Sequence, residues 1–262
     1  MIYADPPFYT RRRFTIGNKK ETAYDDRWPG GREEYLNLLY DAFTLFHKLL
    51  HPSGLLFVHI DYRSSAYAKL LLDEIFGEKN FCNEIIWNYQ SGGRATKHFS
   101  RKHDNIYMYS KTRSYAFYPK AVGIIRGSQR RNHMKRSIDK DGRVYFSIKS
   151  AGKEYRYYED DKIVPSDVWT DISFLHQKHP ERTGFSTQKP EALLKRIILS
   201  STEEGDLIGD FFCGSGTTLV TAAKLNRKWV GCDSSHTAIK ICQERLLALE
   251  HNTTYEIRRE EQ

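Results

Sequence analysis

The chain has 262 residues, of which 39% are hydrophobic and 28% charged, so it can bury a sizeable core in one large α/β domain. No apolar run approaches the roughly 18 residues of a membrane-spanning helix, and no signal-peptide pattern opens the sequence, so we expect a cytoplasmic protein. Its four cysteines show no Cys-x-x-Cys spacing and no histidine pattern beside them, which argues against a zinc site and against a disulfide framework.

The net charge of +8 is concentrated in one part of the chain. Between Lys111 and Lys162, 14 Lys and Arg stand against 6 Asp and Glu, an excess equal to that of the whole sequence. This basic stretch is also rich in tyrosine, and basic residues interleaved with aromatic rings suit a nucleic acid. A solvated surface insertion has the same composition, so both interpretations stay open at this level.

The chain opens on a short apolar run that ends in Asp5-Pro6-Pro7-Phe8. The two prolines fix φ and lack an N–H, so the carbonyls around them stay free to accept hydrogen bonds. Asp5 adds an ionised acceptor, and Phe8 adds a flat face on which a planar ring can stack. The exocyclic amine of a nucleobase would find acceptors and a platform here, whereas an ordinary loop entry is the alternative interpretation.

Strands and helices then alternate, which indicates a doubly wound parallel sheet. Apolar residues at helical spacing, capping residues and short apolar runs set the expected elements. In order, these are a long loop over 10–31, a helix over 34–50, a strand over 55–61, a helix from Ser64 or Ser65 to Phe76 that ends at Gly77, and strands over 85–89 and 105–109.

The basic stretch interrupts this alternation. Short β-like pieces such as 143–147 flank a turn at Asp139–Gly142, so we expect a small inserted subdomain rather than a linker. A loop over 164–187 follows, and then a helix with Pro190 in its first turn. We therefore divide the chain into a first half over 1–110, an insertion over 111–175 and a second half over 176–262.

The second half contains a strand, a glycine-rich turn and a helix start, Leu207-Ile208-Gly209-Asp210-Phe211-Phe212-Cys213-Gly214-Ser215-Gly216-Thr217. Glycines let a cofactor approach the backbone, and the helix N-terminus adds N–H donors. Leu219 stands where a dinucleotide fingerprint needs a third glycine, so NAD and FAD are disfavoured, and no Gly-Lys-Ser/Thr follows to make a P-loop. A later strand ends at Asp233, placed to hold ribose hydroxyls or merely to cap a helix.

Three segments taken together resemble the amino-group DNA methyltransferases that use S-adenosyl-L-methionine. They are Asp5–Phe8, Thr187-Gln188-Lys189-Pro190 and the turn that begins at Asp210, and the match extends over most of the chain outside the basic insertion. The order, with the catalytic motif first and the cofactor motif last, resembles the permuted β class. The resemblance implies a Rossmann-like methyltransferase sheet in which the insertion reads double-stranded DNA.

The resemblance also implies roles for individual residues. Asp5 and the Pro6 carbonyl would accept hydrogen bonds from the target amine, with Pro7 completing the catalytic motif and Phe8 stacking on the flipped base. The implied cofactor-binding residues are Asp5, Gln188, Lys189, Pro190, Asp210, Phe211, Phe212, Gly214, Ser215, Gly216, Thr217 and Asp233.

This chemistry needs no metal and no covalent enzyme intermediate. Acceptors that pull on the amine hydrogens favour a tetrahedral nitrogen, which attacks the sulfonium methyl in line once the base has left the helix. Methylation at cytosine carbon five is disfavoured because that reaction uses a cysteine after a proline, and no Pro-Cys occurs. Asp-Pro-Pro with Phe resembles the adenine-N6 enzymes, so we expect adenine and keep cytosine-N4 as the alternative.

Relatives usually carry residues before the catalytic strand, which here begins almost at Met1. A truncated, inactive DNA-binding remnant is therefore a second hypothesis, and methylation of RNA or another amine is a third. The resemblance also suggests a cognate restriction endonuclease and a homodimer as partners.

Overall fold

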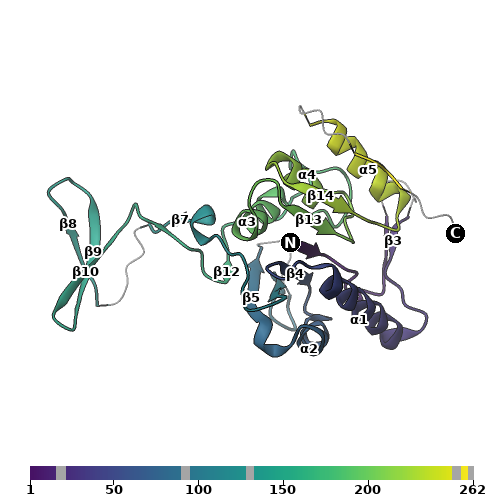
Figure 1. Ribbon diagram of the computed structural model, residues 1–262, viewed down its shortest axis with the longest axis horizontal. Coiled ribbons are helices and arrows are strands. Elements are labelled where there is room, and N and C mark those ends of the chain that lie inside the picture. The colour runs from purple at the N-terminus through teal and green to yellow at the C-terminus, as the bar shows by residue number, and fades with distance from the viewer. Residues whose placement is uncertain (16–21, 90–94, 128–132, 250–254, 259–262) are drawn as a thin grey trace. The chain divides into compact units, whose positions relative to one another are not determined.

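The computed structural model describes residues 1–15, 22–89, 95–127, 133–249 and 255–258 (Figure 1). Two compact units divide the chain, the first formed by Met1–Phe117 with Asp167–Gln262 and the second by Tyr118–Ser166. The second unit spans fewer residues than the predicted insertion over 111–175. Among the described residues, no helix is both long and apolar enough to cross a membrane.

The first unit is built on a seven-stranded sheet with the order β12-β5-β6-β4-β1-β13-β14. Strand β6 runs antiparallel to both of its neighbours, and the other neighbouring pairs are parallel. The predicted doubly wound α/β sheet is therefore confirmed. The strands are β1 (Ile2–Ala4), β4 (Leu55–Ile60), β5 (Phe81–Asn88), β6 (His103–Ser110), β12 (Val168–Trp169), β13 (Leu207–Asp210) and β14 (Lys228–Gly231).

The central strands are buried on both faces, and their side chains alternate between two hydrophobic clusters with the period of two that a strand imposes. Ile2 and Ala4 belong to one cluster, whereas Tyr3 belongs to the other. Helices α1 (Gly31–Leu49) and α2 (Ser65–Phe76) cover the first face, and α3 (Glu191–Ser201) and α4 (Thr217–Lys224) lie on the second (Figure 1). Helix α5 (His236–Leu247) packs against α4.

Two stretches that were predicted as loops contain strands. In the stretch over 10–31, β2 (Arg13–Thr15) pairs antiparallel with β3 (Thr22–Asp25), and the rings of Phe14 and Tyr24 stack with centroids 4.6 Å apart. Too few apolar residues fall in this ribbon to make a periodic pattern, and residues 16–21 lie outside the described residues. In the stretch over 164–187, β12 adds to the edge of the sheet beside β5.

Two helix starts also differ from their predictions. Ser64 is the N-cap of α2 but makes no capping bond, because its hydroxyl donates instead to the Phe8 carbonyl at 3.2 Å. Pro190 is the N-cap of α3 with extended backbone angles, so it precedes the first turn rather than lying in it. Gly77 ends α2 in the left-handed region with φ +83°, as predicted.

The second unit contains a three-stranded antiparallel sheet and a two-stranded one. In the larger sheet, β8 (Lys135–Ile138) and β9 (Val144–Ser150) flank the predicted turn at Asp139–Gly142, and β10 (Lys153–Tyr158) follows. The smaller sheet pairs β7 (Ile124–Ile125) with β11 (Lys162–Ile163). Arginines stack on tyrosines here, with Arg143 4.0 Å from the Tyr158 ring centroid.

Candidate active site

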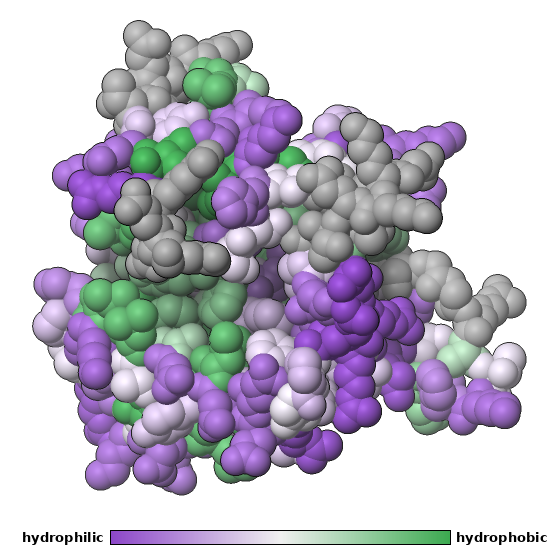
Figure 2. Space-filling view, turned by 90° about the vertical axis from the view of Figure 1, so that its right-hand side faces the viewer, coloured by the Kyte–Doolittle hydropathy of each residue, from purple (hydrophilic) through white to green (hydrophobic). Residues whose placement is uncertain are grey.

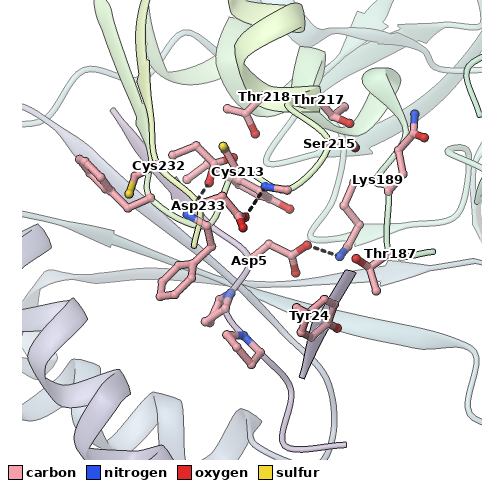
Figure 3. Close-up of a pocket in the computed structure, with 18 of the residues that line it drawn as sticks. Asp5, Tyr24, Thr187, Lys189, Cys213, Ser215, Thr217, Thr218, Cys232 and Asp233 are labelled. Atoms are coloured by element: carbon pink, nitrogen blue, oxygen red, sulfur yellow. Dashed lines mark hydrogen bonds and ion pairs between the residues drawn. The ribbon is translucent and has the colours of Figure 1, made fainter. Parts of the chain in front are cut away.

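A pocket of about 330 Å³ opens at the carboxyl ends of β1 and β13 (Figure 3). Ligand sites in open α/β sheets lie at this edge, because the loops that follow parallel strands converge there. On the face of the molecule that carries β3, α1 and α5, hydrophobic side chains gather in a recess between hydrophilic rims (Figure 2). The pocket is lined by Tyr3, Asp5–Phe8, Tyr24, Leu38, Phe185, Thr187–Lys189, Leu194, Asp210–Ser215, Thr217, Thr218 and Cys232–Ser234.

Asp5 lies at the centre of this pocket and forms an ion pair with Lys189 through Oδ2 (Figure 3). Its second oxygen, Oδ1, is buried and accepts no hydrogen bond from the described residues. The Lys189 ammonium also lies 5.1 Å from the centroid of the Phe8 ring. A buried carboxylate oxygen without a donor is costly, so the site is prepared for a ligand that brings one.

The Asp5–Phe8 segment is held by hydrogen bonds to its later carbonyls. The Tyr35 hydroxyl donates to the Pro7 carbonyl at 2.8 Å, and the Ser64 hydroxyl donates to the Phe8 carbonyl. The Pro6 carbonyl accepts no hydrogen bond from the described part of the chain. The carbonyl next to Asp5 therefore remains available, as the prolines led us to expect.

A network of buried polar side chains packs against one side of Phe8. His59, which is fully buried, makes contacts of 2.9 Å from Nδ1 to the Tyr3 hydroxyl and 3.1 Å from Nε2 to Asp104. Because a carboxylate only accepts, Nε2 of a neutral His59 carries the proton and the Tyr3 hydroxyl donates to Nδ1. The Phe8 ring stacks on His59 with centroids 6.0 Å apart, and Tyr89 donates to Asp104 at 3.0 Å.

Asp210 is almost completely buried at the start of the glycine-rich turn and accepts a hydrogen bond from the Phe212 N–H at 3.2 Å. Burial, together with the charges of Asp5 and Asp233, raises the pKa of Asp210 to about 7. Burial also raises the pKa of Asp233. The charges of Asp5 and Asp233 thus disfavour the ionised form of Asp210, and a cationic ligand would relieve that cost.

Asp233 ties two turns together, because its carboxylate accepts from the Gly214 and Ser235 N–H groups, both at 2.8 Å. Gly216 has φ +75°, and a Cβ there would lie 2.2 Å from the Cys242 Sγ. Only glycine fits both the backbone angle and the close packing of this turn against α5.

Arg245 holds the glycine-rich turn from behind. Its guanidinium donates to the Ser215 carbonyl and to the Thr217 hydroxyl, both at 2.9 Å, and pairs with Glu191 at 3.2 Å. The hydroxyl of Thr217 is therefore oriented by the protein before any ligand arrives.

The structure gathers most of the predicted site residues into this one pocket but separates a few. Gln188 lines the pocket, yet its amide is engaged, because Oε1 accepts from Thr183 and Nε2 donates to the Glu181 carbonyl at 2.7 Å. Pro190 and Gly216 do not line the pocket.

Sequence reasoning missed several pocket residues. Tyr24, which lines the pocket, comes from the ribbon that was predicted as a loop. His59 and Asp104 lie behind the pocket, and the signal for His59 was a polar residue within an otherwise apolar strand. No local pattern indicated Tyr24 or Asp104.

Known proteins resemble this chain in sequence. A family model described as DNA methylase, of the N6/N4 methyltransferase type, matches residues 1–244. Type II methyltransferase M.EcaI of Enterobacter cloacae is 30% identical over 94% of this chain, which spans 64% of that relative's length. DNA adenine methyltransferase YhdJ of Escherichia coli is 28% identical over 98% of this chain and 79% of its own.

Solved structures resemble this chain in fold. The M1.HpyAVI–SAM complex matches 94% of this chain and 87% of its own with a TM-score of 0.56 and 18% identity. The cytosine-N4-specific PvuII DNA methyltransferase matches 97% of this chain and 80% of its own with a TM-score of 0.60 and 17% identity.

Proposed function

Because this chain belongs to the N6/N4 DNA methylase family, we propose that it transfers a methyl group from S-adenosyl-L-methionine to the N6 amino group of adenine in DNA. The observation that carries the proposal is the convergence of Asp5 and Phe8 with Asp210 and Asp233 on one pocket. These residues come from opposite ends of the sequence, and an acceptor for an amine and a cradle for a cationic cofactor thereby lie side by side.

The chemistry of the pocket fits S-adenosyl-L-methionine. This cofactor supplies an electrophilic methyl group on a positively charged sulfur, and its ammonium, ribose hydroxyls and adenine amine all seek acceptors. Asp210 and the backbone at Gly214 would hold the methionine part, and Asp233 would take the ribose. Phe185, Phe211 and Phe212 provide apolar walls for the rest of the cofactor.

The target base would enter beside Asp5. The free Oδ1 of Asp5 and the Pro6 carbonyl would each accept one hydrogen of the exocyclic amine, while Phe8 stacks on the ring. These two acceptors favour a tetrahedral nitrogen with its lone pair directed at the methyl group. When the nitrogen has taken the methyl group and the neutral thioether has left, the Asp5 carboxylate would accept the proton that the nitrogen releases.

Lys189 would leave the face of the Phe8 ring when the target base stacks there, because its ammonium lies 5.1 Å from the ring centroid. Its ion pair with Oδ2 of Asp5 leaves Oδ1 free for the arriving amine. Until then, Lys189 keeps the charge of Asp5 compensated inside a largely buried pocket, which avoids an unpaired buried anion.

Adenine is favoured over cytosine by Asp-Pro-Pro with Phe, and the adenine methyltransferase YhdJ supports it. The second unit, with its basic residues and stacked arginines, would read the DNA sequence. Type II methyltransferases among the relatives suggest a cognate restriction endonuclease as a partner, and a second copy of this chain is a further one.

The test is methyl transfer from labelled S-adenosyl-L-methionine to unmethylated bacterial DNA, followed by digestion to nucleosides and mass spectrometry. Label on adenine N6 is the expected result. Label on cytosine N4 would keep the mechanism and change the base, and label on RNA alone would change the substrate. Salt-sensitive DNA binding with no label would favour the inactive remnant over the enzyme.

A further inference from the structure

Among the described residues of the first unit, four arginines lie on tyrosine rings. Arg11 lies 5.0 Å from the Tyr9 ring centroid and Arg32 4.9 Å from that of Tyr67. The other two, Arg63 and Arg101, share one ring, that of Tyr62, at 4.7 and 4.2 Å. None of these arginines belongs to the basic stretch over 111–162.

The Tyr62 ring therefore has two guanidinium groups stacked on it, and the residue is 42% exposed. Arg101 also donates to the Tyr62 hydroxyl at 3.1 Å, and no carboxylate among the described residues pairs with Arg101. Arg63 pairs with Asp61, but a guanidinium has five N–H donors, so donors remain for another anion. Stacking fixes both groups while leaving their edges free, which suits phosphate oxygens.

The sheet register puts this cluster next to the proposed base site. Ala4 of β1 lies opposite Val58 of the neighbouring parallel strand β4. Phe8 comes four residues after Ala4 and Tyr62 four residues after Val58, so both leave the same edge of the sheet. Ile60 lies opposite Asn105 of the antiparallel strand β6, and Arg101 lies two residues before that strand begins at His103, so it emerges at the same edge. The hydrogen bond from Ser64 to the Phe8 carbonyl joins the two segments directly.

Phe99, two residues before Arg101, is 97% exposed. A phenyl ring that stays in water contributes no hydrophobic stabilisation to the folded protein. A DNA strand from which one base has been flipped exposes base faces on which such a ring can stack. The charged pair and the exposed ring thus offer the two kinds of contact that a distorted DNA strand requires.

We propose that Arg63 and Arg101, stacked on Tyr62, bind the DNA phosphates beside the flipped nucleotide and that Phe99 stacks on a base left exposed by flipping. The inference rests on the proposed function and extends it, because it assigns DNA binding to the first unit as well as to the basic insertion. Phosphate contacts carry no sequence information, so this surface supports every DNA sequence equally.

The test measures DNA affinity against salt concentration for the full chain. Each arginine that neutralises a phosphate contributes roughly 0.9 to the slope of log K against log salt. Arg63→Gln and Arg101→Gln should each lower the slope by about 1 and weaken binding about tenfold at low salt, equally for different DNA sequences. Phe99→Ser should weaken binding by about tenfold without changing the slope, because stacking releases no counterions.

Lys48→Gln is the matched control, since it removes one positive charge from the far end of α1 and should leave affinity and slope unchanged. Arg101→Lys keeps the charge and should keep the slope, which separates charge loss from misfolding, and unfolding temperatures verify each variant. Wild-type affinity and slope in Arg63→Gln and Arg101→Gln would overturn the phosphate contacts, and wild-type affinity in Phe99→Ser would overturn the stacking contact.

The two proposals fail separately. A wild-type protein that methylates DNA while the arginine variants bind as it does would overturn this surface alone. A wild-type protein that binds DNA through these arginines but transfers no methyl group would overturn the proposed reaction and leave the surface standing.

Discussion

The Asp5→Asn substitution removes one negative charge from the pocket while keeping the size and shape of the side chain. A hydrogen bond from the target amine to a carboxylate is charge-assisted and about twice as strong as one to an amide oxygen. Losing one such interaction in the transition state typically costs about 10²- to 10³-fold in rate. Because the Pro6 carbonyl still accepts the second amine hydrogen, we expect kcat to fall by about 10²- to 10³-fold rather than to zero.

The same substitution leaves Lys189 without its anionic partner. The Asp5 side chain is 17% exposed and that of Lys189 is 11% exposed. The unpaired Lys189 ammonium should therefore cost about 1–3 kcal/mol of unfolding free energy. Adding Lys189→Met should recover most of this stability, since it removes the buried charge, but should not recover kcat.

Single-turnover methyl transfer and thermal unfolding measure the two effects independently. Cofactor binding to Asp5→Asn, measured by calorimetry, serves as the control that the pocket is intact. A kcat within threefold of the wild type would refute the role assigned to Asp5. Recovery of kcat in the double variant would show that the loss came from a misplaced Lys189 instead.

Three other predictions concern the pocket. Phe8→Leu should raise the KM for DNA about tenfold or more through lost stacking, while Phe8→Tyr should stay near the wild type in the same steady-state assay. Gly216→Ala should lower the unfolding temperature by more than Gly205→Ala, because both glycines have positive φ but only at Gly216 does a Cβ meet Cys242; equal losses would contradict this reasoning. The folded-state pKa of Asp210, about 7, lies above its ordinary value of 3.8. The contribution of its protonated form to the free energy of unfolding is therefore complete below pH 3.8 and is lost as pH rises through 7. Asp210→Asn should remove up to about 4 kcal/mol of this decline in unfolding free energy. The affinity of the wild type for the cofactor should rise about tenfold from pH 6 to 8. Neither effect is expected if Asp210 titrates at its ordinary pKa.

The sequence by itself determined the sheet class and the two chemical motifs. Asp5–Phe8 and the turn from Asp210 to Thr217 are contiguous, and their meaning depends on local geometry: prolines without N–H groups and glycines with positive φ. Alternating strands and helices were visible because periodicity is also a local property. The ribbon of β2 and β3 was not visible, since its cross-strand contacts are one stacked ring pair and an ion pair between Arg13 and Asp25 rather than a repeating apolar pattern.

Only the tertiary structure decided which side chains meet. Lys189 pairs with Asp5 across 184 positions of sequence, and His59 reaches Asp104 across 45. Both contacts depend on the order of strands in the sheet, which is set by how the hydrophobic clusters on its two faces pack. Gln188 shows the opposite case. A local motif predicted that it binds the cofactor, but in the folded loop its amide is hydrogen-bonded to Thr183 and Glu181.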